Sequence, residues 1–568
     1  MIELQYLDID PSIEKKLTYS AQNVQNTAAV TTLCTGGTAP LYATCEWFGW
    51  PLDGHRKLLK DGQMPLWSQS FSGGRSGCLG AGALGGFTLN SADATLDTPP
   101  VVEVQISQAC TVPGITFVFS PEEDRWCEKM EITFYRGQTV VHSAIVYPDA
   151  PRWILPAPGY SFDRLTVRLL ETDTPGAYAK LRGLYLGRAL VFSHRETESV
   201  RLINEADPTL DTLTVDTMTV DVQDLQQWGL EPQKDQTMEL YRDGQLLASH
   251  RIENCSRREK HRYTIRCRSL VGQLEGTFLG GMYENMPLET LLSKILKNVE
   301  FEVEAPLKQT KISGYLPVCT CRQALQQVAF AVGAVVSTRG TRGVRLCRVS
   351  DRVSGVFLAE DQFRDGGVET AAGVSRVEVV AHKYTPTREE VTLIDGEYYK
   401  GSDILLTFTE PYHSYQLSGG TILAQGVNYV RLSASGEITL KACTYRHTMV
   451  HHSRSYDPDY GDQVRKVEQA TLIHDGNVHQ VLDRLGQVYA FRQTLNQTMV
   501  VTDQYAGQQV ALTDPFGGMM KGYITAMECE LTPGGQTAWI TLLGQRQTPE
   551  IAVGYAGMLY AGEKEEML

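Results

Sequence analysis

Residues 314–336 read GYLPVCTCRQALQQVAFAVGAVV, and this stretch sets the character of the fold. Thr320 followed by Gln323 is a capping-box pattern, in which the hydroxyl and the amide each satisfy a free backbone N–H group at a helix start. Apolar residues then recur at helical spacing on one face: Ala324, Leu325, Val328, Ala329 and Val332. Residues 334–336 (AVV) and 344–346 (VRL) flank a turn with two glycines, which predicts a hairpin. The stretch therefore predicts a helix that leads into paired strands.

Two thiols, Cys319 and Cys321, flank the start of this predicted helix and raise the question of a metal or redox site. The chain has 12 cysteines, which are scattered, and none of them forms a CxxC pair. A zinc site normally needs two close ligand pairs, and neither Cys347 nor the histidines have ligand-like spacing. We therefore expect reduced, mostly buried thiols. A thiolate at Cys321, stabilised by the helix N-terminus, is the alternative.

The bulk composition is that of a large globular protein. The chain has 568 residues, 42% hydrophobic and 21% charged, and this length suggests about three to five domains. A formal net charge of −14 disfavours stable binding to nucleic acid or anionic lipid. No apolar run reaches the ~18 residues of a membrane helix, and the first residues, MIELQYLDID, lack the layout of a signal peptide. We therefore expect a chain that is made and folded in a cytoplasm.

Period-two alternation dominates the rest of the chain. Short alternating strands with proline and glycine turns fill residues 46–190 and predict one β-sandwich. Thr and Asp alternate with apolar residues over 207–220, which predicts a further strand. Asp243-Gly244 lies between two alternating runs and is the strongest short signal for a hairpin.

Two more helices interrupt this β-rich chain. The first follows Pro287, and its apolar face contains Leu288, Leu291, Leu292, Ile295 and Leu296. The second follows Asn477, which is a good N-cap residue. The predicted fold class is therefore mainly β with minor α (α+β), in several domains.

Two motifs suggest a phosphate-binding loop and a zinc site, but each lacks residues or structure that such a site requires. Residues 73–86, GGRSGCLGAGALGG, lack the Lys and the following helix of a phosphate-binding loop. His447, His451 and His452 would need a helix to hold zinc as an i, i+4 pair, but residues 438–445 before them predict a strand. We expect these histidines at an exposed strand end or in a loop.

Two acidic motifs also favour ordinary turns. The segment from Asp457 to Glu468 has the length of a calcium loop, but its glycine falls at the fifth position, where a ligand belongs. Residues 122–124 follow a proline and predict a surface turn. No nucleophile–histidine signature is present, so we predict no catalytic, cofactor-binding or metal-binding residues and no enzyme activity.

Three tryptophans, Trp47, Trp50 and Trp67, lie near the start of the predicted sandwich. Exposed indole rings stack on sugar rings, which makes these residues candidates for carbohydrate binding. A role in a core or a domain seam is the alternative, and it is the commoner one.

The order of these elements resembles a known family. The sandwich, the Thr/Asp-rich strand, the Asp-Gly hairpin and a Leu-rich helix precede GYLPVCTCRQALQQVAFAVGAVV, and a long β region, a helix and VALTDPFGGMMKGYITAMECEL follow it. The chain resembles the tail-tip or baseplate hub proteins of tailed bacteriophages, as carried by prophages of Gram-positive hosts. The resemblance is strongest over 205–350 and 477–545. Residues 46–190 look like an inserted discoidin-like, galactose-binding-like jelly roll.

The resemblance implies hub-type β-barrel domains in addition to the sandwich. The expected parts are an N-terminal arm (1–45), the jelly roll (46–190), a first hub barrel (191–280), an α+β hub domain (281–350), a second hub barrel (351–476) and a C-terminal helix with strands (477–568).

The resemblance also implies a function in the virion, at the distal end of the tail. Such hubs are homotrimers that seat the tape-measure protein, join the distal tail protein ring and close the tail tube, as part of host attachment and DNA delivery. Receptor-binding proteins and a host cell-wall glycan are further implied partners, DNA is expected only in transit, and no stable membrane insertion is expected. The net charge suggests an acidic channel lining. The competing hypotheses are a carbohydrate-binding adsorption protein that acts through 46–190, and a glycan-active enzyme.

Overall fold

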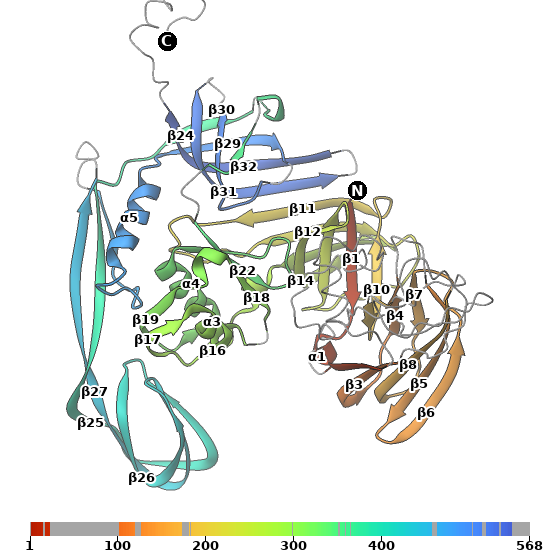
Figure 1. The fold of residues 1–568 in the computed structure, drawn as a ribbon, viewed down its shortest axis with the longest axis horizontal. Helices are drawn as coiled ribbons and strands as arrows, with labels where there is room; N and C mark the ends of the chain where they lie inside the picture. The colour runs from red at the N-terminus through yellow and green to blue at the C-terminus, as the bar shows by residue number, and fades with distance from the viewer. Residues whose placement is uncertain are drawn as a thin grey trace, which may run out of the picture. The chain divides into compact units, whose positions relative to one another are not determined.

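The structure, a computed structural model, describes residues 2–14, 17–22, 101–119, 126–172, 181, 183–297, 299–349, 353–357, 359–363, 365–456, 463–501, 504–513, 518–532 and 535–547. The chain divides into two compact units. We call them the sandwich unit (residues 3–193 and 231–239) and the large unit (residues 1–2, 194–230 and 240–568). Strands far outnumber helices (Figure 1), so the prediction of a mainly β, multidomain chain with minor α is confirmed.

The sandwich unit contains two antiparallel sheets that share one core. Their strand orders are β2-β3-β8-β5-β6 and β7-β4-β9. The strands are β2 (Leu17–Gln22), β3 (Val101–Cys110), β4 (Gly114–Val118), β5 (Cys127–Arg136), β6 (Thr139–Val146), β7 (Arg152–Pro156), β8 (Phe162–Thr172) and β9 (Gly183–Tyr185). Because side chains alternate along each strand, Val104, Phe134 and Leu165 of the larger sheet meet Phe117 and Leu184 of the smaller one.

The N-terminal strand is attached to the same unit. β1 (Ile2–Asp8) pairs antiparallel with β10 (Arg188–Phe192), and the short helix α1 (Pro11–Glu14) follows it. Asp8 joins three segments, because Nη2 of Arg188 lies 2.6 Å from its Oδ2 and Nε2 of Gln236 donates to its Oδ1 at 3.1 Å.

A long antiparallel sheet runs through the large unit, in the order β14-β15-β12-β11-β31-β32-β29-β24. Its strands are β11 (Thr197–Glu205), β12 (Thr217–Gln223), β14 (Gln245–Arg257), β15 (Arg262–Arg268), β24 (Gly367–Thr370), β29 (Gln493–Val500), β31 (Met519–Thr532) and β32 (Gly535–Gln547). β30 (Gln509–Thr513) pairs with β31 and with β23 (Gly355–Val356). β11 and β31 lie side by side (Figure 1), with Arg201 opposite Glu530, so segments from both ends of the large unit share this sheet.

Residues 277–349 form the α+β part of the large unit. Helices α3 (Leu288–Leu296) and α4 (Cys321–Val332) share a core with short strands. These strands are β16 (Thr277–Phe278), β17 (Gly281–Pro287), β18 (Phe301–Val303), β19 (Lys311–Leu316), β20 (Cys319–Thr320), β21 (Ala334–Ser337) and β22 (Val344–Arg348). The predicted capping box is confirmed: the backbone N–H of Gln323 donates to Oγ1 of Thr320 at 3.1 Å, and that of Thr320 donates to Oε1 of Gln323 at 3.0 Å. α4 ends at Val332, and the residue that caps it, Gly333, has a φ of 71°, which favours glycine.

A long antiparallel ribbon belongs to the same unit (Figure 1). β25 (Arg376–Thr407) and β27 (Tyr429–Ser455) pair along most of their length, β26 (Tyr412–Gln425) adds a third strand, and β28 (Val464–Val467) pairs with the start of β25. We call residues 376–385 and 446–455 the ribbon base, and residues 386–445 the distal lobe.

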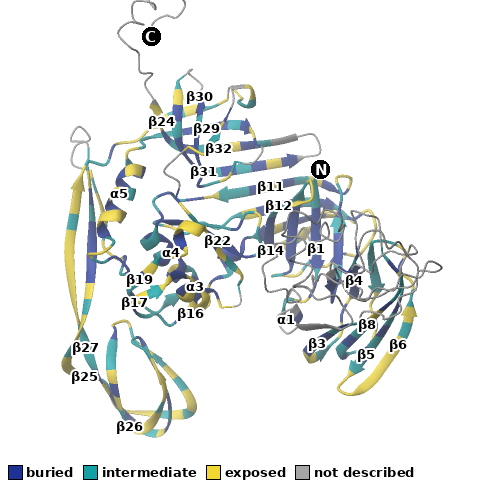
Figure 2. Ribbon diagram, viewed as in Figure 1, coloured by how far each residue is buried: buried dark blue, intermediate teal, exposed yellow. Residues whose placement is uncertain are grey.

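The ribbon base and the distal lobe have separate cores. In the base, Val377 and Val379 share a core with Val481 and Leu485 of α5 (Val478–Tyr489). The lobe has a small core of its own that includes Leu432 and other residues of its three strands. Many residues of the lobe are exposed to solvent (Figure 2).

The strand predicted over 207–220 is wrong for its first ten residues. Only β12, from Thr217 onward, is extended and paired, and residues 206–216 form a loop. The physical reason is local, because the side chain of Asp207 accepts hydrogen bonds from Thr209 and Thr212 and holds the backbone in a turn.

Two further local predictions need correction. His447, His451 and His452 do not lie in a loop, because β27 continues through them to Ser455 and pairs with β25. His451 and His452 are near the end of this strand, and His447 and His451 are exposed, as expected. Asn477 does precede α5, but its side chain does not cap the first turn. Its Oδ1 accepts instead from the backbone N–H of His474 at 2.8 Å.

Candidate functional site

One face of the large-unit sheet is buried and the other, which we call the polar face, is mainly polar. The buried face includes Val200, Leu202, Met218, Val220, Met527, Cys529 and Ile540. On the opposite face, Thr219, Arg201 and Glu530 lie side by side across β12, β11 and β31. Side chains alternate between the two faces along these strands, apart from a bulge between Thr197 and Ser199 in β11 and one between Ile524 and Ala526 in β31.

Charges of both signs occupy the polar face. Arg201 pairs with Glu528, and Nη2 of Arg262 lies 2.8 Å from Oε1 of Glu198. Among the charged residues on this face are Arg201, Arg251, Arg262, Arg266 and Arg268 with Glu198, Asp221, Glu528 and Glu530. Ion pairs this exposed contribute at most about 1 kcal/mol each, so they add little stability. The acidity of the whole chain is not concentrated on this face.

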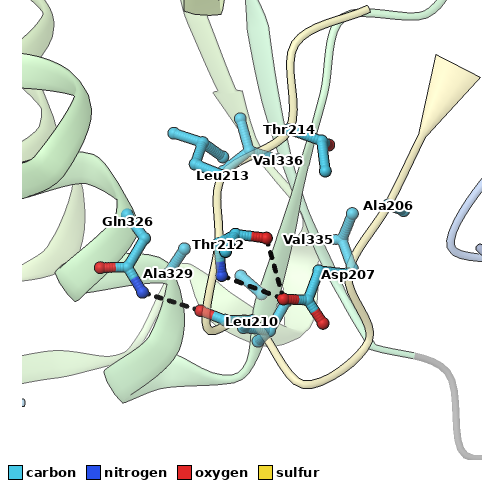
Figure 3. A pocket seen from close by; sticks show the side chains of 11 residues that line it. Ala206, Asp207, Leu210, Thr212, Leu213, Thr214, Gln326, Ala329, Val335 and Val336 are labelled. Carbon is cyan, nitrogen blue, oxygen red and sulfur yellow. Dashed lines mark hydrogen bonds between the residues drawn. The ribbon is translucent and has the colours of Figure 1, made fainter.

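The loop between β11 and β12 encloses a small cavity (Figure 3). Asp207 accepts hydrogen bonds from the N–H and the hydroxyl of Thr209 at 2.9 and 2.5 Å, and from those of Thr212 at 3.0 Å each. Nε2 of Gln326 in α4 donates to the carbonyl of Leu210 at 2.8 Å. The cavity measures about 10 Å³, which is room for roughly one water molecule. It is a gap in packing and too small for a substrate.

A wider groove of about 760 Å³ borders the same loop. Its size suits a small ligand, but its charged groups are already engaged with one another. Oδ2 of Asp211 lies 2.8 Å from Nη2 of Arg465, and Asp207 is held by its own loop. The residues that line the groove include no histidine, serine or cysteine. The groove therefore offers no paired nucleophile and base.

The histidines on the ribbon base form a stacked arrangement. The rings of His447 and Tyr384 lie 4.3 Å apart and nearly parallel, at 4°. Nε2 of His447 lies 2.9 Å from Nδ1 of buried His382. Among the described residues, no group of three or more His, Cys, Asp or Glu side chains is placed to hold a metal ion.

The two thiols near α4 are packed side chains. Cys321 opens the helix and is buried, and Cys319 lies in β20. Burial, followed by the neighbouring Cys321, raises the pKa of Cys319 to about 11. This thiol is therefore protonated at neutral pH and a poor nucleophile. The cysteines within the described ranges are free thiols, of which four are buried (Cys127, Cys267, Cys321 and Cys529) and five are half-buried, so fewer are buried than expected.

Several predicted residues lie outside the described residues. They are Trp47, Trp50 and Trp67, the glycine-rich stretch 73–86, residues 122–124 and the start of the acidic segment at Asp457. Stacking of the tryptophans on sugar therefore stays a prediction. In the part of the chain that the structure does describe, no helix has both the length and the apolar character needed to cross a membrane.

Comparisons with known proteins give structural similarities only. No family model and no curated protein matches the sequence. A 43 kDa prophage tail protein from Shewanella oneidensis is 10% identical with a TM-score of 0.38, and the match covers 63% of this chain and 95% of that one. A tail protein from Neisseria meningitidis is 13% identical (TM-score 0.37, 61% and 91% covered). A prophage tail protein from Listeria monocytogenes is 10% identical (TM-score 0.37, 66% and 95% covered). These scores are too low to establish a common fold.

The sequence contained a signal for the polar face of the large-unit sheet but none for the stacking of Tyr384 on His447. Alternation of polar and apolar residues in β12 and β31 is visible in the sequence and could have identified the polar face. The stacking of Tyr384 on His447 depends on the pairing register of β25 and β27, which no local pattern reveals.

Proposed function

We propose that this chain is a structural protein of a bacteriophage tail, and that it acts as the hub at the tail tip or baseplate. The observation that carries the proposal is the large-unit sheet, in which one face is buried and the other is mainly polar, with Trp539 as an exposed exception. This sheet contains segments from both ends of the large unit, which meet where β11 pairs with β31. Copies of such a sheet, arranged in a ring with the polar faces inward, would line a water-filled tube.

A closed ring requires head-to-tail contacts between copies, and we propose a homotrimer. In this hypothesis the trimer joins the distal tail protein ring on one side and seats the end of the tape-measure protein. DNA passes through the tube without binding stably. The mixed charges on the polar face suit this role, since a strongly basic lining would hold the phosphates and slow their transit.

No catalytic step is part of this proposal. The loop cavity has room for about one water molecule, and the groove beside it holds an ion pair between Asp211 and Arg465. The hydrogen bond from Gln326 to Leu210 holds the loop between β11 and β12 against α4, and the Asp211–Arg465 ion pair holds it against β28.

A second proposed role concerns host attachment through the sandwich unit. Its two sheets form a stable scaffold on which loops can bind a cell-wall sugar. The test is a glycan array with the full chain and with a variant in which Trp47, Trp50 and Trp67 are replaced by Ala. Binding that the triple variant loses would support sugar recognition, and no binding by the natural chain would leave only the structural role.

The tail-hub proposal is tested by native mass spectrometry and electron microscopy of the full chain. We expect a species of three times the 63.1 kDa of one chain, with a threefold ring. Thr219→Cys on the polar face, labelled with maleimide gold, should add density at the ring centre. The natural chain, labelled in the same way through its own thiols, is the control. A monomer at all concentrations, or gold from position 219 only at the periphery, would contradict the proposal.

A further inference from the structure

Four aromatic rings form a column between β19 and the ribbon base. Tyr315 of β19 contacts Tyr384 at 4.9 Å between ring centroids, and Tyr384 stacks on His447 at 4.3 Å. His447 in turn lies parallel to His382, at 5.1 Å and 15°. We call Tyr315, Tyr384, His447 and His382 the aromatic column.

The end of β19 also holds the distal lobe. The hydroxyl of Tyr315 donates to the carbonyl of Thr409, in the loop between β25 and β26, at 3.0 Å. The next residue, Leu316, accepts a hydrogen bond at 2.8 Å from the side chain of Asn428, which lies between β26 and β27. Tyr315 itself is fixed by Thr471, whose hydroxyl donates to its carbonyl at 2.6 Å. One short segment thus contacts both the column and the two loops at one end of the lobe.

The two imidazoles of the column, buried His382 and exposed His447, share one hydrogen bond. With 2.9 Å between Nδ1 of His382 and Nε2 of His447, one nitrogen must donate and the other must accept. An acceptor nitrogen cannot carry a proton, so this contact cannot exist when both rings are cationic. Two cations at this distance would also repel each other.

Among the described residues, no carboxylate forms an ion pair with either imidazole, and the histidine ion pair in this region is that of His452 with Asp475. The groups that face the column are the phenols of Tyr384 and Tyr315, the carboxylate of Glu410 beyond them, and the backbone of Glu468 next to His382. Burial, and then His447, lower the pKa of His382, while the backbone of Glu468 acts in the opposite direction. The arrangement therefore favours at least one neutral imidazole.

We propose that the aromatic column is a proton-sensitive contact that holds the distal lobe against the end of β19 at neutral pH and releases it when both histidines are protonated. This device does not depend on the tail role proposed above. Its sign follows from linkage: the attached state disfavours the second proton, so its stability is complete above the ordinary histidine pKa of about 6.5 and falls as the pH decreases below that value.

Hydrogen exchange of the full chain, read by mass spectrometry at about pH 7.5 and pH 5.5 and corrected for the intrinsic rate, tests the proposal. Peptides that cover residues 408–428 and 311–316 should lose protection by about tenfold at the lower pH. Peptides from β3 in the sandwich unit should not change. Equal protection of the lobe peptides at both pH values would overturn the proposal.

Single substitutions distinguish protonation of the aromatic column from a general effect of acid on the protein. His447→Phe keeps a stacking ring but removes the second proton site, so the lobe should stay protected at the lower pH. His451→Phe, on the same strand and outside the column, should behave as the natural chain. Asn428→Ala should expose the lobe at both pH values, because it removes the bond to Leu316. A pH response that persists unchanged in His447→Phe would also overturn the proposal.

Discussion

Asn428 and Leu316 meet where the distal lobe contacts the α+β part of the large unit. The side chain of Asn428 is fully buried, and its nitrogen donates to the carbonyl of Leu316 at 2.8 Å and to that of Leu279 at 3.2 Å. A buried amide needs such partners, since an unsatisfied one costs about 1–3 kcal/mol. Gly280 makes the contact possible, because it leaves the space that the amide fills.

Gly280→Ala should therefore weaken this attachment. The new methyl group would overlap the nitrogen of Asn428 and the carbonyl oxygen of Leu316, and φ at this position is +72°. Left-handed backbone alone costs a residue with a β-carbon about 1–2 kcal/mol, and overpacking adds a similar amount. We expect a lower melting temperature by scanning fluorimetry. Gly367→Ala, where a methyl group meets nothing within 4 Å, is the matched control, and equal melting of the two variants would contradict the account.

The loop at 206–216 gives a second prediction. Asp207→Ala removes four hydrogen bonds to Thr209 and Thr212, and bonds to a carboxylate are among the stronger ones. We expect a loss of about 2 kcal/mol in the free energy of unfolding of the large unit, measured by urea denaturation. Asp395→Ala, at an exposed position in the distal lobe, should change it by less than about 0.5 kcal/mol. A variant at 207 as stable as the one at 395 would show that the turn holds without its carboxylate.

This loop also shows where sequence reasoning stops. Helices α3 and α4 were predictable because the apolar face of each helix and the capping box of α4 are local patterns. Residues 207–216 carry the same alternation as a strand, but Asp and Thr side chains offer the backbone local partners that compete with a sheet. The strand prediction was correct only from Thr217 onward, where the chain pairs with the neighbouring strands β11 and β15.

The pairing of strands that are distant in the sequence could not be predicted, for a different reason. The polar face exists because β31 lies next to β11, with Arg201 opposite Glu530, and no pattern within either strand specifies the other. The same holds for Tyr384 and His447, which are opposite each other only in the observed register. Register follows from the burial of a whole sheet face, so it appears only when the complete core is known.

Buried thiols give a third prediction. Burial raises the pKa of Cys127 to about 12 and that of Cys529 to about 11, so very little thiolate forms at pH 8. Iodoacetamide should leave both residues unmodified in the native chain, as measured by peptide mass spectrometry. The same residues should react fully in concentrated urea, which serves as the control. Rapid native labelling of either one would mean that its burial is transient.

The last prediction concerns His250 in β14, which is 1% exposed. Burial lowers its pKa from 6.5 to about 4, against a smaller opposite effect of the Ser249 backbone. The unfolded chain therefore takes up a proton near pH 6.5 while the folded chain does not. Stability is complete above that pH and falls by about 3 kcal/mol as the pH decreases toward 4. Urea denaturation at a series of pH values should show this loss in the natural chain and in His194→Leu, an exposed control, but a smaller loss in His250→Leu. The same pH dependence in all three proteins would assign the acid sensitivity to other groups.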